Sequence, residues 1–202
     1  MTTGGDNIAI GYNAIGAGNH ASFDQNIAIG SYALDAAGAV ALSDCISIGY
    51  DSMTGAVTAG ADGSIAIGTS ALAAITSAAG NVAIGYLAMD ANQQGAYNMA
   101  IGEHALGAIN DDGSGSNIAI GSYAMDGVGT LADCHSNLMI GVHTGGGSWA
   151  TTASSHNIGI GGYALYGALE GSVGTVAIGY EALKALTSGA RNVAIGYQAG
   201  DD

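Results

Sequence analysis

The sequence has no proline and almost no basic residues, and each absence excludes a class of protein. Among 202 residues there are 2 Lys and Arg against 16 Asp and Glu, so the formal net charge is −14. A surface this poor in cations releases few counterions from phosphates, which argues against nucleic acids and anionic membranes as partners. Glycine is abundant, with 36 copies, but without proline the chain is not collagen-like.

Long apolar runs are also lacking, although apolar residues are not. Hydrophobic residues make up 49% of the chain and charged residues only 9%, which is the opposite of a disordered acidic tail. No run approaches the roughly 20 apolar residues of a membrane-spanning helix. The first six residues lack the basic end and apolar stretch of a signal peptide. We therefore expect a folded chain without membrane insertion.

A nine-residue unit recurs eleven times. The first copy, residues 7–15, reads NIAIGYNAI, and the copies begin at residues 7, 26, 45, 64, 81, 98, 117, 137, 157, 175 and 192. Successive copies start 17 to 20 residues apart. Because the units and their connectors account for the whole chain, we predict a single repeat domain over residues 1–202.

Positions within the unit predict its local structure. Position two is aliphatic or Met and position four is always Ile, with a small residue between them in nearly every unit. Branched apolar side chains two residues apart predict a short strand. We expect each position-four Ile to stack on the next inside the core, and the small position-three residues to allow close approach on a flat outer face. Positions eight and nine predict a second, shorter strand.

Position five is glycine in all eleven units. Glycine is expected where the chain turns with positive φ or where two backbones approach closely. The predicted structural residues are the eleven Ile–Gly pairs, namely Ile10, Gly11, Ile29, Gly30, Ile48, Gly49, Ile67, Gly68, Ile84, Gly85, Ile101, Gly102, Ile120, Gly121, Ile140, Gly141, Ile160, Gly161, Ile178, Gly179, Ile195 and Gly196.

A short strand every 17 to 20 residues is typical of a β-solenoid with one coil per repeat. The sequence thus predicts an all-β fold, a parallel β-solenoid of eleven coils forming a rod roughly 50 Å long. Asn occupies position one in eight units and predicts a ladder of hydrogen-bonded amides. A helix over residues 180–186 is the alternative, but glycine-rich segments occupy the same positions in other units.

The unit Asn-(Ile/Val)-Ala-Ile-Gly-Tyr-x-Ala-Leu resembles the repeats of trimeric autotransporter adhesin heads and of many bacteriophage tail fibres. The resemblance covers residues 7–200 and implies a left-handed parallel β-roll, assembled as a homotrimer on a virion or a cell surface and used in attachment. The chain shows no heptad-patterned stalk and no membrane anchor, which favours a fibre segment over an autotransporter.

Our leading hypothesis is a structural and adhesive fibre protein whose partners are copies of itself and a host or cell-surface glycan or protein. Copies would associate as a homotrimer or stack end to end through unpaired strand edges. The alternatives are a polysaccharide-binding module that uses loop and corner aromatics, and a self-stacking extracellular filament subunit. The sequence shows no nucleophile elbow, and no Ser or Thr lies beside a recognisable general base with its orienting residue, so nothing in it suggests an enzyme.

Aromatic and histidine side chains are the binding candidates. Five tyrosines directly follow the position-five glycine, and Trp149 lies with two histidines around the least typical coil. Such rings can pack a corner or contact sugars. The candidates are Tyr12, Tyr50, Tyr86, Tyr180, Tyr197, Trp149, His143 and His156.

Metal binding is the weaker hypothesis. Asp111 and Asp112 could hold calcium, the one cofactor that the sequence suggests, although a solvated acidic turn is the favoured explanation. Cys134 and His135, with the histidines of neighbouring coils, could approach zinc geometry. Cys45 lies five coils from Cys134, about 24 Å along the axis, which is too far for a disulfide.

Overall fold

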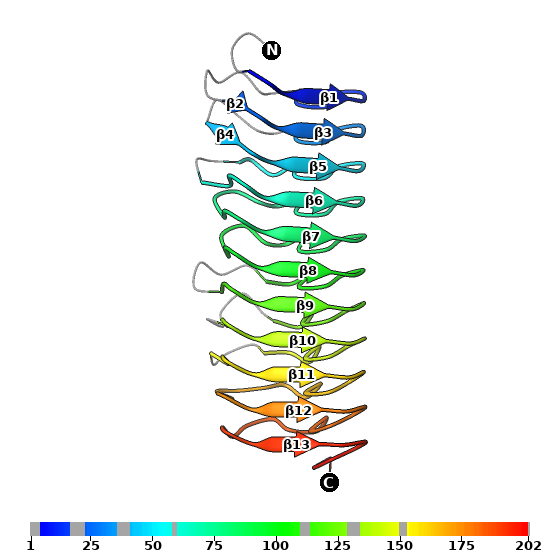
Figure 1. Ribbon diagram of the computed structural model, residues 1–202, viewed down its shortest axis with the longest axis vertical. Helices are drawn as coiled ribbons and strands as arrows, with labels where there is room; N and C mark the ends of the chain where they lie inside the picture. Colours follow the sequence, from blue (N-terminus) through cyan, green and yellow to red (C-terminus); the bar gives the residue numbers. More distant parts are fainter. Residues whose placement is uncertain are drawn as a thin grey trace.

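The protein is a parallel β-solenoid (Figure 1). The computed structural model describes residues 5–16, 23–35, 41–57, 60–109, 114–128, 134–149 and 153–201. Within these ranges no residue is helical, including residues 180–186, so the all-β prediction is confirmed and the helical alternative is wrong. The tight turns after the strands lie along one edge of the rod, and the longer connectors lie along the other (Figure 1).

Each of the eleven units contributes one strand to a single parallel sheet. In sheet order the strands are β1 (Ile8–Ile10), β3 (Ile27–Ile29), β5 (Ile46–Ile48), β6 (Ile65–Ile67), β7 (Val82–Ile84), β8 (Met99–Ile101), β9 (Ile118–Ile120), β10 (Leu138–Ile140), β11 (Ile158–Ile160), β12 (Val176–Ile178) and β13 (Val193–Ile195). The connectors add a second, two-stranded parallel sheet of β2 (Phe23–Asp24) and β4 (Leu42–Ser43). All position-four isoleucines pair in register, as predicted, with Ile10 beside Ile29 and Ile178 beside Ile195.

The two faces of the sheet are the reverse of our expectation. Position three is fully buried in the nine inner units, whereas positions two and four are partly exposed on the outer face. In the inner coils the isoleucines keep partial exposure, and in the outermost strands Ile10 and Ile195 are 59% and 67% exposed. The prediction that isoleucine fills the core was therefore wrong. The small residues face inward.

The small residues face inward because the strand lies close to the return segment of its own coil. Position three packs across the coil against positions eight and nine, and the pairing is visible in coil three, where the hydroxyls of Ser47 and Ser52 lie 2.6 Å apart. Most coils place Ala at positions three and eight and Leu or Met at position nine, all buried. Because the position-nine side chain fills most of the space between the strand and its return segment, a small side chain packs best at position three.

Positions seven to nine form a turn rather than the predicted second strand. His104 and Leu106 in one such turn have φ of 53° and 52°, and 28 described residues other than glycine have positive φ. This left-handed conformation costs an L-residue about 1–2 kcal/mol. Hydrogen bonds between coils offset that cost, because the Leu106 amide donates to the Ala124 carbonyl at 2.9 Å.

The glycine prediction is confirmed for both of its physical reasons. Gly102 has φ of 137°, and a Cβ on it would lie 2.6 Å from the carbonyl carbon and oxygen of Gly121. The position-five glycines of the other coils repeat this arrangement, except Gly196, which has no coil beyond it among the described residues. The glycines form a continuous column where neighbouring backbones touch.

The predicted amide ladder is confirmed and lies inside the solenoid. Asn117 is fully buried, and its Nδ2 donates to Asn98 Oδ1 at 3.1 Å and to the Cys134 carbonyl at 2.8 Å. Its own Oδ1 accepts from the backbone amide and from Nδ2 of Asn137. Asn117 thus joins its coil to the coils on both sides and to the connector that enters the next coil.

Coil eight has a locally rearranged core. It carries Met139 at position three, where other coils have a small residue, and Gly145 at position nine, while the next coil has Gly159 at position three. A Cβ on Gly159 would lie 2.5 Å from Met139 Sδ, and a Cβ on Gly145 would lie 3.1 Å from the Trp149 ring. Two glycines therefore make room for Met139 and Trp149.

We expect Gly159→Ala to destabilise the protein by about 1–3 kcal/mol, because the new methyl group overpacks against Met139. In a Met139→Ala background the contact with Met139 Sδ is removed, although Thr144 Cγ2 at 2.8 Å remains, so the same change should cost at least about 1 kcal/mol less. A double-mutant cycle from urea unfolding measures this difference. Strictly additive effects would contradict the packing explanation.

Candidate functional site

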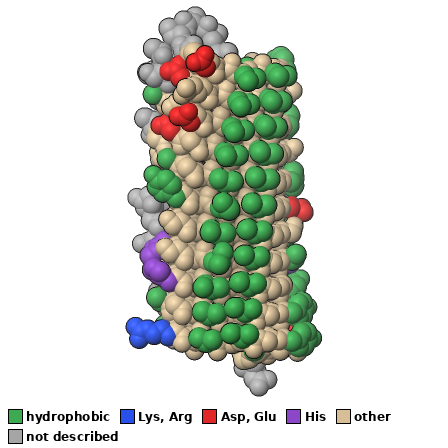
Figure 2. Space-filling view, viewed as in Figure 1, with side chains coloured by type: hydrophobic (Ala, Val, Ile, Leu, Met, Phe, Trp, Pro, Cys, Tyr) green, Lys and Arg blue, Asp and Glu red, His purple; other side chains and the backbone are tan. Residues whose placement is uncertain are grey.

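An aliphatic face covers the outer side of the long sheet. It consists of the eleven position-four isoleucines together with Ile8, Ile27, Ile46, Ile65, Val82, Met99, Ile118, Leu138, Ile158, Val176 and Val193. Figure 2 shows these side chains as two columns along the full length of the rod. With strands about 4.8 Å apart, the face covers on the order of 500 Å², which is near the upper end for exposed patches on monomers.

A column of aromatic rings runs along the tight-turn edge. The aromatic ladder comprises seven rings from seven consecutive coils, with centroids 5.0 to 6.2 Å apart: Tyr86, His104, Tyr123, His143, Tyr163, Tyr180 and Tyr197. A shorter ladder joins Tyr12, Tyr32 and Tyr50. The turn after β6 separates the two, because it carries Thr69 and Ser70 instead of rings.

The sequence placed the corner tyrosines correctly but missed the ladder. The five candidates Tyr12, Tyr50, Tyr86, Tyr180 and Tyr197 are 46–72% exposed. The missed signal was the alternation of Tyr and His at position seven, where the stacked rings cover one another's faces. Since sugars pack against ring faces, this stacking leaves mainly edges and hydroxyls for a ligand.

Trp149 does not line a surface site. Its side chain is fully buried and is the largest in the core. The Trp149 backbone bonds to that of the preceding coil, where its amide donates to the Gly127 carbonyl at 3.0 Å. As a candidate for contact with a ligand at the surface, Trp149 is therefore corrected to a core residue.

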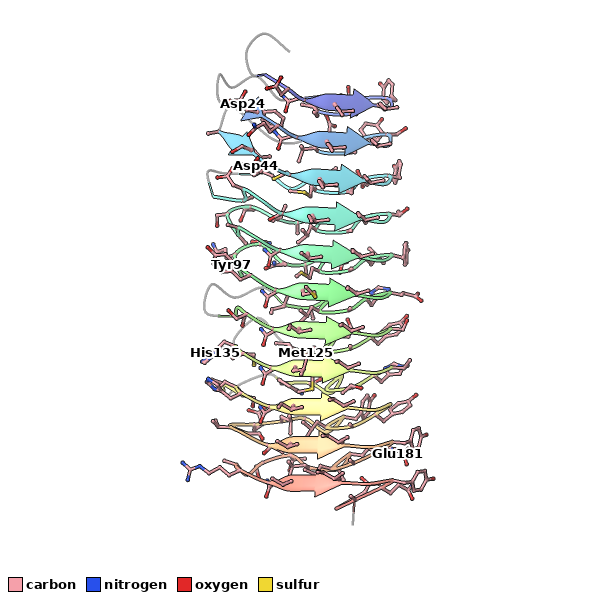
Figure 3. All side chains as sticks on the ribbon, viewed as in Figure 1. Asp24, Asp44, Tyr97, Met125, His135 and Glu181 are labelled. Atoms are coloured by element: carbon pink, nitrogen blue, oxygen red, sulfur yellow. The ribbon has the colours of Figure 1, made fainter. Side chains whose placement is uncertain are left out.

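The predicted group of Cys134, His135, His143 and His156 divides between two edges of the rod. His143 belongs to the aromatic ladder, between Tyr123 and Tyr163. His135 lies on the opposite edge, where the strands begin (Figure 3), and its ring is 5.1 Å from that of His156. Cys134 is buried.

The structure brings together no larger set of metal ligands in the part of the chain it describes. No three His, Cys, Asp or Glu side chains converge there. Asp111 and Asp112, the calcium candidates, lie outside the described residues. Cys45 and Cys134 belong to the coils of β5 and β10, which are separated by four strands, and both are free thiols. Burial raises the pKa of the Cys45 thiol to about 11, so it is protonated at neutral pH.

Charged side chains at the turns interact electrostatically with rings of the aromatic ladder. Partial burial raises the pKa of the Asp90 and Asp126 carboxyls, and the nearby His104 ring opposes that shift in both. Glu181 accepts from Lys184 Nζ at 2.6 Å, and this bond lowers the pKa of its carboxyl. Lys184 Nζ also lies 5.6 Å from the centre of the Tyr163 ring.

The geometry defines a repeat protein with extended surfaces rather than an enclosed site. The described residues enclose no pocket and contain no helix that could cross a membrane. The chain is thus a parallel β-solenoid whose prominent outer features are an aliphatic face and an aromatic ladder. Comparisons with protein-family models, with curated proteins and with solved structures found no significant match.

Proposed function

We propose that the protein is a rigid segment of a fibre on a virion or a cell surface, where it assembles with copies of itself and mediates attachment. The observation that carries this proposal is the aliphatic face. Isoleucine stands at position four in every coil although it points away from the core. A partner surface explains that regularity.

A second copy of the chain is the partner that fits the face best. The two columns of side chains repeat with the strand spacing, so an identical rod presents the same repeat and the same length. Closed symmetry around the rod axis then buries every copy's face, and three copies agree with the adhesin and tail-fibre resemblance. The attachment function rests on that resemblance and on the exposed turn edge.

Replacing isoleucines of the aliphatic face with aspartate is expected to prevent this assembly. We expect the wild-type chain to run as a trimer in size-exclusion chromatography with light scattering, and the triple variant Ile48→Asp, Ile84→Asp, Ile120→Asp to run as a monomer. Its circular dichroism should retain the β-sheet spectrum, because these side chains lie outside the core.

The matched control adds the same charge at the turn edge, in the variant Tyr12→Asp, Tyr50→Asp, Tyr86→Asp. This variant should remain trimeric. A monomeric wild-type chain, or a face variant that stays assembled while folded, would contradict the proposed interface.

A further inference from the structure

His135 and His156 form a pair on the connector edge of the rod. His156 lies two residues before β11, and His135 lies three residues before β10 in the neighbouring coil. The His156 amide donates to the His135 carbonyl at 3.2 Å, so the backbone fixes their separation. Their ring centroids are 5.1 Å apart and the ring planes are nearly perpendicular, at 87°.

This separation matches that of two imidazoles on one metal ion. A zinc–nitrogen bond is about 2.0–2.1 Å long, and an imidazole centroid lies about 1.1 Å behind its nitrogen, so each centroid sits about 3.2 Å from the ion. At a tetrahedral angle, two such centroids are about 5.2 Å apart. The coil spacing therefore places the two rings at a chelating distance.

The surroundings suit a cation. His156 is exposed and His135 is half-buried, and Figure 2 shows a patch of His side chains at the surface of the rod. The net charge of −14 favours cation accumulation. Ser136 Oγ lies 3.4 Å from Nδ1 of His135, which makes Nε2 the expected ligand atom. Cys134 is buried, so the metal ligands that we consider at this edge are His135 and His156.

We propose that His135 and His156 bind one divalent transition metal ion, of the Zn²⁺, Ni²⁺ or Cu²⁺ class that imidazole prefers. Two positions are filled by the protein and the others by water, so the ion stays open to a ligand from a second molecule. The site is independent of the aliphatic face and of the proposed assembly.

Zinc titration of the intact chain by calorimetry tests this site. We expect binding of one ion per chain at pH 7.5, weakened at least tenfold in His135→Asn and in His156→Asn. Asn tolerates the left-handed φ of 59° at position 156.

His143→Asn is the matched control, because it removes an imidazole from the aromatic ladder and leaves the pair intact. It should bind zinc as the wild type does. Equal loss in the control, or wild-type affinity in both pair variants, would overturn the proposal. A second test uses the wild-type chain and so does not depend on the folding of any variant. Bound zinc should slow the modification of His135 and His156 by diethyl pyrocarbonate but not that of His143. If zinc does not slow the modification of His135 and His156, the proposal is contradicted.

Discussion

Replacing Gly102 with alanine is expected to unfold the coils around it, at a cost of at least about 4 kcal/mol. Two effects add at this position. The φ of 137° is a conformation that suits glycine alone, and the new Cβ would lie 2.6 Å from the Gly121 carbonyl, which belongs to a backbone that cannot move without breaking the sheet. Chemical denaturation followed by circular dichroism measures the loss.

Gly196→Ala separates the two effects. Gly196 has nearly the same φ, 133°, but the nearest atom to its added Cβ is the Ala199 methyl group at 3.9 Å. It should therefore cost only the conformational penalty, about 1–3 kcal/mol. Equal destabilisation by the two variants would show that close approach of the coils contributes nothing.

Replacing Asn117 with alanine is expected to cost about 2–5 kcal/mol. The change leaves the Cys134 carbonyl and the Asn137 amide without their Asn117 partners inside the solenoid, and an unsatisfied buried group costs about 1–3 kcal/mol. Because the ladder links consecutive coils, we expect the amides of Ile118 and Leu138 to lose protection in hydrogen exchange first.

Asn192→Ala provides the comparison, since Asn192 occupies the same position in the coil of β13 and is only partly buried. Water reaches this position and can solvate the groups left by the change, so we expect a cost below about 1 kcal/mol. A loss at Asn192 as large as that at Asn117 would mean that the amide ladder acts through the backbone conformation and not through buried hydrogen bonds.

Features that repeat from coil to coil were predictable because each follows from the physical properties of one residue type at a fixed position of the unit. The strand follows from two apolar residues around a small one, and the glycine column follows from an invariant Gly at position five. The Asn ladder follows from an amide repeated at one position. Stacking of identical units turns each of these local signals into a column, so the register could be inferred without coordinates.

The candidate site was predictable only in part. The corner tyrosines were placed correctly on the surface, because a ring after a glycine turn has no core to enter. The burial of Trp149 was not predicted, because it depends on space that two glycines leave. Gly145 leaves room for the Trp149 ring in the same coil, and Gly159 in the next coil leaves room for Met139. The pairing of His135 with His156 also needed the fold, since 21 positions separate them in the sequence.

The sequence by itself determined the repeat, the strand positions, the parallel register and the places where only glycine fits. Only the tertiary structure decided which face of the strand is inside. Alternation specifies two faces but does not show which of them is buried. Inside the coil, Leu or Met at position nine already fills the space opposite the strand in most coils, so small residues turn inward and the aliphatic residues form the outer face. The same close packing holds Leu and Tyr in left-handed turns that no local preference would select.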